Sequence, residues 1–237
     1  MNTWRFLDTG PAAAAENMAE DEELLRGAGK PDSLPVLRFY TWLPPAVSLG
    51  RFQDAEHSVN AETCRRHGID IVRRITGGRA VLHKDELTYS IVAPVGNSLF
   101  PNDVLGTYKV IATGLLAGLR GLGIAAEMVS RSGRHAGMVK SRTQEPACFS
   151  SPSWYEILAR GRKIIGSAQR RVSGAFLQHG SILMGYDPAL EAEVIPGGGM
   201  QDAVTCVRSE LRREVTLEEV KTAFREGFSR SLEIMYK

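Results

Sequence analysis

The stretch from Cys148 to Ser181 holds a thiol and, fifteen residues later, a lysine, Lys163. Two short strands are predicted here, over 154–158 and 163–167, joined by a turn at 159–162. Because paired strands bring facing residues to within about 5 Å, this hairpin could place Lys163 beside the segment that carries Cys148. An ammonium group next to a thiol lowers the thiol pKa and so increases the fraction of thiolate. Cys148 is therefore the candidate nucleophile and Lys163 its candidate activator.

Residue type alone leaves a simpler interpretation open for both positions. A single cysteine is more often a small buried apolar side chain than a nucleophile. A single lysine in a strand is more often a solvated residue that protects a sheet edge from aggregation. A second, independent signal is needed to decide between these interpretations.

Composition places the chain among ordinary globular proteins. It has 237 residues, of which 43% are apolar and 24% charged, so it can bury a full core. Its three cysteines show neither metal-binding nor disulfide-framework spacing, which is typical of a reducing compartment. The N-terminus lacks the apolar core of a signal peptide, and no run of residues is long enough to span a bilayer. We therefore expect a cytoplasmic protein with no membrane association.

Positive charge is concentrated around the candidate nucleophile. Between Arg131 and Arg171 there are nine Lys or Arg residues and only two Glu, although the net charge of the whole chain is +2. Such a segment attracts acidic partners, although scattered solvated charge would give the same count. No helix-turn-helix or aromatic-interleaved pattern supports a nucleic acid as the partner. An acidic protein is the partner that this segment favours.

Helices and strands alternate along the chain without the regular spacing of βαβ units. Helices are expected over 12–26 after Pro11, over 61–67, over 104–122 and over 217–234 after a capping box of Thr216 and Glu219. Strands are expected over 36–42, 46–50, 69–74, 79–83, 87–93 and 175–184. Three internal glycines of the helix 104–122, Gly106, Gly114 and Gly118, are expected to permit close packing on a sheet. The pattern predicts an α+β (mixed α/β) fold in a single domain, 1–237, with a mixed or antiparallel sheet.

The second signal lies in the stretch Arg73–Ser90. Its glycine pair, Gly77 and Gly78, allows backbone conformations closed to other residues and lets the main chain approach a ligand closely. The free amides of such a pair could cradle a carbonyl or a phosphate group. On its own the pair would also fit a plain hairpin turn.

Taken with the segments Gly161–Gln169 and Leu177–Leu183, this stretch closely resembles the biotin/lipoate protein ligase family. The resemblance extends from Trp4-Arg5-Phe6 to the last helix. Within the family, the context Cys-Phe-x-x-Pro-Ser-Trp-Tyr-Glu, here residues 148–156, is most similar to the octanoyltransferases of lipoate synthesis in Gram-positive bacteria. The resemblance implies a largely antiparallel mixed sheet flanked by helices, as in class II tRNA synthetase-like catalytic domains.

The resemblance also implies an activity. Enzymes of this kind transfer an octanoyl group from acyl carrier protein to a lysine of a lipoyl-domain protein. In that activity Cys148 would carry the acyl group as a thioester and Lys163 would assist it. No metal is implied, and we expect a monomer. The substrate-binding residues that the resemblance implies are Arg73, Arg74, Thr76, Gly77, Gly78, Arg79, Val81, His83, Gly166, Ser167, Ala168 and His179, and the apolar side chains Val81, Leu82, Ile164 and Ile165 are possible walls for an eight-carbon chain.

Two departures from the family pattern bear on the cofactor and on the site. Ligases that activate lipoate carry a third glycine where this chain has Arg79, and an accessory C-terminal domain that we do not expect here, so we expect no ATP requirement and no cofactor. The family's His-Asp pair reads His83-Lys84, with Asp85 one position late, so the role of that acid stays open. Three alternatives also stay open: transfer between two lipoyl-domain proteins, ATP-dependent ligation of lipoate, and non-catalytic binding of an acyl or lipoyl carrier.

Overall fold

The computed structural model describes residues 2–30, 32–128, 156–172, 174–199 and 201–237. Cys148, the adjoining residues of its sequence context up to 155, and the basic residues from Arg131 to Arg142 lie outside the described residues. The architecture below concerns the described part of the chain alone.

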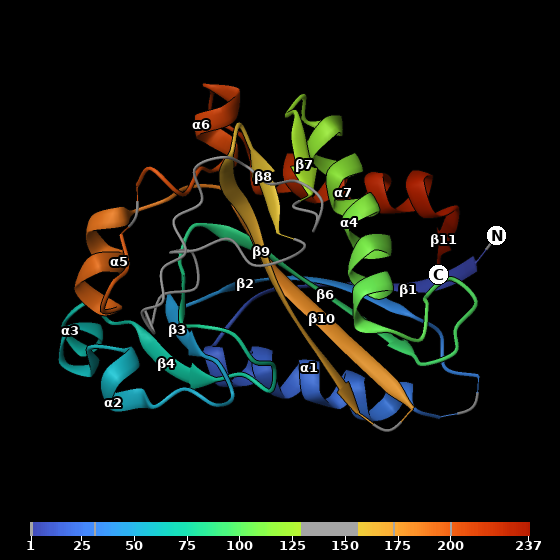
Figure 1. The fold of residues 1–237 in the computed structure, drawn as a ribbon, viewed down its shortest axis with the longest axis horizontal. Helices are drawn as coiled ribbons and strands as arrows, with labels where there is room; N and C mark the ends of the chain where they lie inside the picture. The colour runs from blue at the N-terminus through green and yellow to red at the C-terminus, as the bar shows by residue number, and fades with distance from the viewer. Residues whose placement is uncertain (1, 31, 129–155, 173, 200) are drawn as a thin grey trace.

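An eight-stranded sheet forms the centre of the fold (Figure 1). Its order is β11-β1-β2-β6-β10-β9-β8-β7. The β11–β1 and β1–β2 pairs are parallel, and every other pair in this sheet is antiparallel. The strands are β1 (Asn2–Ala12), β2 (Val36–Trp42), β6 (Glu86–Pro94), β7 (Ala126–Met128), β8 (Ile157–Ala159), β9 (Arg162–Val172), β10 (Ala175–Leu183) and β11 (Ile234–Tyr236). The prediction of a mixed, largely antiparallel sheet is confirmed.

A second, three-stranded sheet packs at one end of the first. Its order is β4-β3-β5, with β3 parallel to β4 and antiparallel to β5. Short helices gather beside it, and together they enclose a small core that includes Val47, Leu49, Cys64 and Val194. These elements are β3 (Ala46–Leu49), β4 (Asp70–Arg73), β5 (Val81–His83), α2 (Ala55–Ser58), α3 (Ala61–Arg66), α5 (Pro188–Val194) and α6 (Val207–Leu211), the last of which lies apart from the small core.

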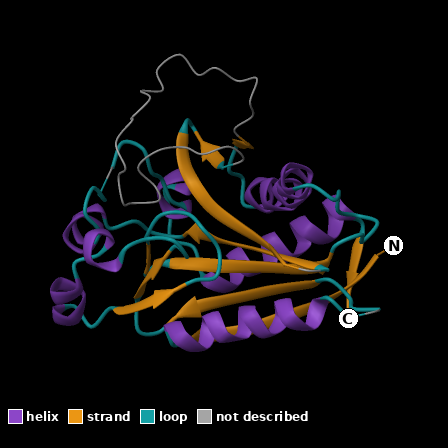
Figure 2. Cartoon of the chain, turned by 60° about the horizontal axis from the view of Figure 1, so that its bottom comes forward, coloured by secondary structure: helices purple, strands orange, loops and turns teal. Residues whose placement is uncertain are grey.

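Long helices cover both faces of the large sheet (Figure 2). Helix α1 (Ala14–Ala28) lies on one face, and helices α4 (Val104–Gly121) and α7 (Leu217–Leu232) lie on the other. The alternation along β2 shows how the sequence specifies the two sides. Leu37 and Phe39 enter the main core with α4 and α7, whereas Tyr40 and Trp42 pack with Met18 of α1. No helix in the described part of the chain combines the length and the apolar character needed to cross a membrane.

Gly114 and Gly118 of α4 pack against α7, and Gly106 lies against Pro101, so the expectation that these glycines pack on a sheet is corrected. A Cβ added at Gly114 would lie 2.1 Å from a ring carbon of Phe228, and one at Gly118 would lie 2.7 Å from Phe224. On the facing helix, a Cβ at Gly227 would lie 2.4 Å from the backbone nitrogen of Gly118. The two helices therefore approach so closely that only glycine fits at their contact.

We expect Gly227→Ala to destabilise the fold, because the added methyl group would meet backbone atoms that cannot rotate away. Overpacking of this kind costs about 1–3 kcal/mol. Gly121→Ala, on α4, is the matched control, because the nearest atom to its Cβ would lie at an ordinary 3.8 Å. The control should fall within about 1 kcal/mol of the wild type, on the stabilising side. Urea denaturation measures both, and equal stabilities for the two variants would contradict the close-packing argument.

Two further details differ from the sequence-based expectations. Residues 2–12 form strand β1, which was not predicted, so Pro11 belongs to a strand and α1 starts at Ala14. Strand β9 extends to Val172, five residues beyond its predicted end at 167. The predicted turn is present, with Arg160 and Gly161 at φ values of 49° and 77°. It places Lys163 opposite Leu158 on β8.

Candidate active site

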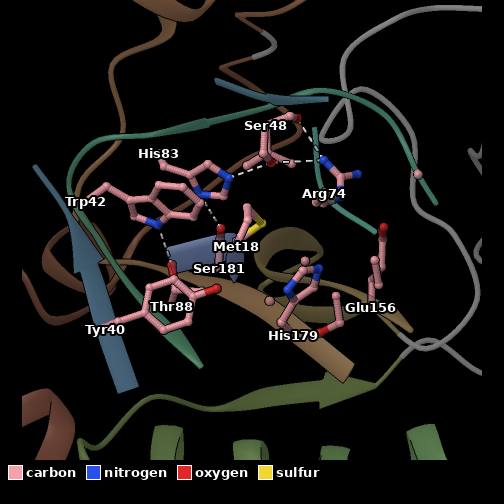
Figure 3. A pocket seen from close by; sticks show the side chains of 16 residues that line it. Met18, Tyr40, Trp42, Ser48, Arg74, His83, Thr88, Glu156, His179 and Ser181 are labelled. Carbon is pink, nitrogen blue, oxygen red and sulfur yellow. Dashed lines mark hydrogen bonds between the residues drawn. The ribbon is translucent and has the colours of Figure 1, made fainter. Parts of the chain in front are cut away.

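A pocket opens between the large sheet and the small one, on the α1 side (Figure 3). It encloses about 600 Å³, counting the part that is open to solvent. Its residues come from α1, from β2, β6, β9 and β10 of the large sheet, and from the small sheet with its adjoining glycine loop. The lining residues are Met18, Tyr40, Trp42, Ser48, Arg74, Gly78, Val81, His83, Thr88, Glu156, Gly166, Ser167, Ala168, His179, Gly180 and Ser181.

One part of the pocket is apolar and aromatic. Tyr40 and Trp42 project from the same face of β2, and Met18 of α1 packs with them. The Trp42 ring stacks on the imidazole of His83 with 4.0 Å between centroids and 14° between planes. Burying an alkyl chain against such walls is worth ~0.8 kcal/mol per methylene group. The pocket is therefore suited to a short acyl chain.

His179 is held by a buried polar network that starts on α1. Its Nδ1 lies 2.9 Å from Asp21 Oδ2 and its Nε2 lies 2.8 Å from Thr76 Oγ1. Asp21 also accepts hydrogen bonds from Arg38 and Tyr40, at 2.9 and 3.0 Å. Burial would raise the pKa of Asp21, yet the hydrogen bond with His179 and the attraction of His179 and Arg38 hold it below its ordinary value. The carboxylate therefore stays charged and fixes the orientation of the His179 ring.

His83 is held in the same manner from the opposite side of the pocket. Its Nδ1 lies 2.9 Å from Glu86 Oε1 and its Nε2 lies 2.7 Å from Ser48 Oγ. Burial would raise the pKa of Glu86, but the charge and hydrogen bond of His83, with a further hydrogen bond from Thr88, hold it below its ordinary value. Glu86 is thus the carboxylate that forms a hydrogen bond with His83. Asp85 instead forms an ion pair with Arg208 at the surface.

Arg74 joins these two histidine networks. Its Nη1 donates to Ser48 Oγ at 3.0 Å, and its Nε donates to Thr76 Oγ1 at 3.2 Å. Its Nη2 donates to the carbonyl oxygens of Gly77 and Arg79, at 2.9 and 2.7 Å. This buried guanidinium therefore fixes the conformation of the glycine loop as well as the two hydroxyl groups that contact the histidines.

Lys163 lies behind the pocket wall and is paired with Glu156. The Lys163 side chain is 2% exposed, and its Nζ donates to Glu156 Oε1. Glu156 itself lines the pocket (Figure 3). A buried ammonium beside a buried carboxylate is strongly destabilising when either partner is removed alone. The hairpin turn thus places a buried Lys163–Glu156 ion pair at this edge of the pocket, with the carboxylate lining the pocket and the ammonium behind it.

The structure brings together eight of the residues that the sequence proposes for substrate binding. Those that line the pocket are Arg74, Gly78, Val81, His83, Gly166, Ser167, Ala168 and His179. Thr76 and Gly77 lie one hydrogen bond behind them, bonded to His179 and to Arg74 respectively.

Other proposed residues lie elsewhere. Arg73 points away from the pocket and donates to the carbonyl oxygens of Gly50, Arg51 and Gln53. Arg79 is absent from the pocket lining, although its carbonyl oxygen accepts a bond from Arg74. Of the proposed acyl-chain walls, Val81 lines the pocket, Leu82 packs against the small core, and Ile164 and Ile165 are buried in the main core.

Several pocket residues were not predicted from the sequence, although the sequence pattern indicates some of them. Tyr40 and Trp42 alternate with core residues on β2, so the period of two could have assigned both to one face. Asp21 lies on the buried stripe of α1 with Asn17 and Met18, at helical spacing. Two members of that stripe are polar, so an apolar pattern alone does not reveal the buried face of the helix. The described residues contain no group of three His, Cys, Asp or Glu side chains that could hold a metal ion.

Comparison with known proteins points to one family. The sequence matches the lipoyl protein ligase A/B catalytic domain over residues 13–229. A curated relative, Octanoyltransferase LipM of Carboxydothermus hydrogenoformans, is 41% identical over 246 residues, which span 100% of this chain and 89% of that protein. Octanoyltransferase LipM of Bacillus subtilis is 38% identical over 243 residues, covering 98% of this chain and 87% of that protein.

Solved structures with the same fold include lipoate-protein ligases. A lipoate-protein ligase A bound with ATP gives a TM-score of 0.82 at 27% identity, covering 100% of this chain and 88% of that one. A putative lipoate protein ligase from T. acidophilum with bound lipoic acid gives a TM-score of 0.79 at 26% identity, with the same coverage of 100% and 88%.

Proposed function

Because the chain belongs to the lipoyl protein ligase A/B catalytic domain family, we propose that it is the octanoyltransferase of lipoate biosynthesis. The enzyme takes an octanoyl group from octanoyl-acyl carrier protein and attaches it to a lysine of a lipoyl-domain protein. Octanoyltransferase relatives that match nearly the whole chain support the acyltransferase activity. The donor, the acceptor and the cysteine intermediate are our proposals.

The observation that carries the proposal is a pocket with one apolar, aromatic side and with the buried Lys163–Glu156 pair in and behind its wall. Met18, Tyr40, Trp42 and Val81 provide contacts for the hydrocarbon chain. The Lys163 ammonium is paired with Glu156, whose carboxylate lines the pocket, so it lies directly behind the wall beside which we place the thioester carbonyl of the bound chain. A fixed donor of this kind stabilises the oxyanion that develops during acyl transfer.

The chemistry requires two exchanges at one carbonyl carbon. In the first, the Cys148 thiolate attacks the octanoyl thioester, the bond to the carrier sulfur breaks, and the carrier leaves as a thiolate that takes up a proton. In the second, the acceptor lysine amine attacks the new thioester, Cys148 leaves as a thiolate, and the nitrogen loses its proton. A thioester is thereby exchanged for an amide, which is downhill without nucleotide activation.

The test is a transfer assay with intact-mass detection. The protein is mixed with octanoyl-acyl carrier protein and a lipoyl domain, and each component is weighed by mass spectrometry. We expect one octanoyl group on the lipoyl domain, and one on the enzyme when the acceptor is omitted. An unmodified acceptor would contradict the proposed function. A modified acceptor without any acylated enzyme would contradict the covalent intermediate alone.

An ATP-dependent ligase is the second candidate, because a ligase bound with ATP shares this fold. We expect transfer from the carrier to proceed in nucleotide-free buffer, and added ATP to change the rate by less than about twofold, because the thioester is already activated. The measurement compares transfer after apyrase treatment with transfer in ATP and magnesium. Attachment of free octanoate or lipoate that depends on ATP would favour the ligase instead.

Transfer between two lipoyl-domain proteins is distinguished by the donor. Octanoylated lipoyl domain, offered in place of the acyl carrier protein, should donate more slowly than the carrier does. The reverse order of donor rates would assign the enzyme as an amidotransferase that uses the same pocket and the same thiol.

A further inference from the structure

An open groove lined mostly by arginines runs beside the pocket, between α1, the end of β4 and the end of β9. It encloses about 950 Å³ of space that is open to solvent. Helix α1, at the bottom of Figure 1, forms one side of it. The residues of this arginine groove are Glu22, Leu25, Arg26, Arg51, Arg73, Arg74, Ile75, Arg170 and Val172. Among the described residues, the lining of the groove thus holds five arginines and one carboxylate.

Among the described residues, these arginines contact backbone carbonyl oxygens more than carboxylates, although the charge of Arg73 also acts on Asp54. Arg73 donates to backbone carbonyl oxygens of the turn that follows β3, and Arg170 donates to the carbonyl oxygen of Ile75 at 3.0 Å. Arg26 pairs with Glu23, but both side chains are 68% exposed, and an exposed pair of this kind contributes little. The groove thus presents a positive potential that attracts an anionic partner.

Apolar groups in and beside the groove favour a protein over a small anion. Leu25, Ile75 and Val172 contribute apolar surface between the arginines. Next to the groove, Phe52 is 87% exposed, and the guanidinium carbon of Arg51 lies 5.4 Å from the centroid of its ring. An exposed aromatic side chain next to arginine is typical of the contact residues of protein interfaces.

The groove also adjoins the acyl pocket, because Arg74 lines both. A partner seated in the groove would therefore lie against the outer side of the wall that carries the glycine pair. This position suits a protein that holds the acyl group on a flexible arm rather than on its own surface.

We propose that the arginine groove docks the acidic carrier protein that delivers the acyl group, with Phe52 contacting an apolar patch on that carrier. The inference rests on the proposed function and names the surface through which the donor is recognised. Long-range attraction would speed encounter, and it would be screened beyond about 10 Å at 0.1 M salt.

The test is the double variant Arg26→Glu with Arg51→Glu, which reverses two charges that make no contact with the pocket. The apparent KM for octanoyl-acyl carrier protein should rise by more than about tenfold at low salt, and its salt dependence should flatten. Self-acylation by a small neutral donor, octanoyl-N-acetylcysteamine, should keep the wild-type rate, which also establishes that the variant is folded.

The matched control is Arg120→Glu with Arg230→Glu, which makes the same charge change at exposed positions on α4 and α7. Its KM should stay within about twofold of the wild-type value.

Each contrary outcome has its own meaning. If the wild type accepts octanoyl groups from the carrier and both double variants show the same KM, the groove is not the docking surface and the proposed function stands. If the KM for the lipoyl-domain acceptor rises while that for the donor does not, the assignment to the donor is wrong. If the wild type takes nothing from the carrier, the proposed function fails together with this inference.

Discussion

Cys148→Ser should reduce octanoyl transfer by more than about a thousandfold, because it would remove the proposed nucleophile of both exchanges. A serine hydroxyl is barely ionised at neutral pH, so it attacks a thioester far more slowly than a cysteine thiolate does. The measurement is single-turnover transfer from octanoyl-acyl carrier protein, followed by the intact mass of the enzyme. The acylated species should disappear in the variant.

The two remaining cysteines serve as matched controls. Cys64 and Cys206 are both buried and free, and burial raises the pKa of the Cys64 thiol, which lowers its thiolate fraction. Cys64→Ala and Cys206→Ala should each retain most of the transfer activity and all of the covalent labelling. Near-normal turnover in Cys148→Ser would exclude the thioester mechanism, and loss of labelling in either control would move the nucleophile to that residue.

Lys163→Ala should slow the chemical step by roughly a hundredfold or more, equivalent to about 3–4 kcal/mol, because it removes a positioned donor to the developing oxyanion. It should also destabilise the fold by about 3–5 kcal/mol, because the Glu156 carboxylate then stays buried without the ammonium that neutralises it. These two effects have different origins and can be separated by a second substitution.

The separating variant is Lys163→Ala with Glu156→Gln. Removing the carboxylate charge should recover much of the lost stability, measured by urea denaturation, while transfer stays slow. Lys163→Arg keeps the charge on a larger planar group, so it should restore part of the Cys148 thiolate fraction but little of the positioning. A pH series of iodoacetamide alkylation at Cys148 reports that fraction. If the double variant regains both stability and rate, Lys163 is a structural partner of Glu156 and has no catalytic role.

Local sequence patterns predicted the interior strands of the fold well. Strand β2 has the predicted bounds, Val36–Trp42, because its alternating apolar residues are bounded by proline on both sides. Strand β1 escaped because its polar residues, with Gly10 and Pro11, are typical of a loop. Its hydrogen bonds depend on β2 and β11, which lie far away in the chain. The end of β9 was not predicted for a similar reason. Gln169 donates a hydrogen bond to Gln178 on the neighbouring strand β10, and this contact is visible only in the structure.

The site residues that belong to a sequence motif could be predicted. Those that act as isolated side chains could not. Family resemblance, confirmed by the match over residues 13–229, identified His83 and His179 together with the glycine pair. The carboxylates that hold those histidines could not be found in this way. Asp21 is one acid among several on α1, and only its burial distinguishes it from Glu22 and Glu23. The roles of Cys148 and Lys163 remain predictions for the experiments above.

In both pocket histidines, each ring nitrogen already has a hydrogen-bond partner within the protein. This bears on how fast water would hydrolyse the proposed acyl-enzyme. Each imidazole has its two nitrogens bonded within the protein, His83 to Glu86 and Ser48, and His179 to Asp21 and Thr76. Neither ring is therefore positioned to take a proton from water, so wasteful hydrolysis of the thioester would lack a base on these two residues. The acceptor lysine, which needs only a neutral amine, would then outcompete the far more concentrated solvent. If the proposed acyl-enzyme forms, the two networks would thus extend its lifetime until an acceptor arrives.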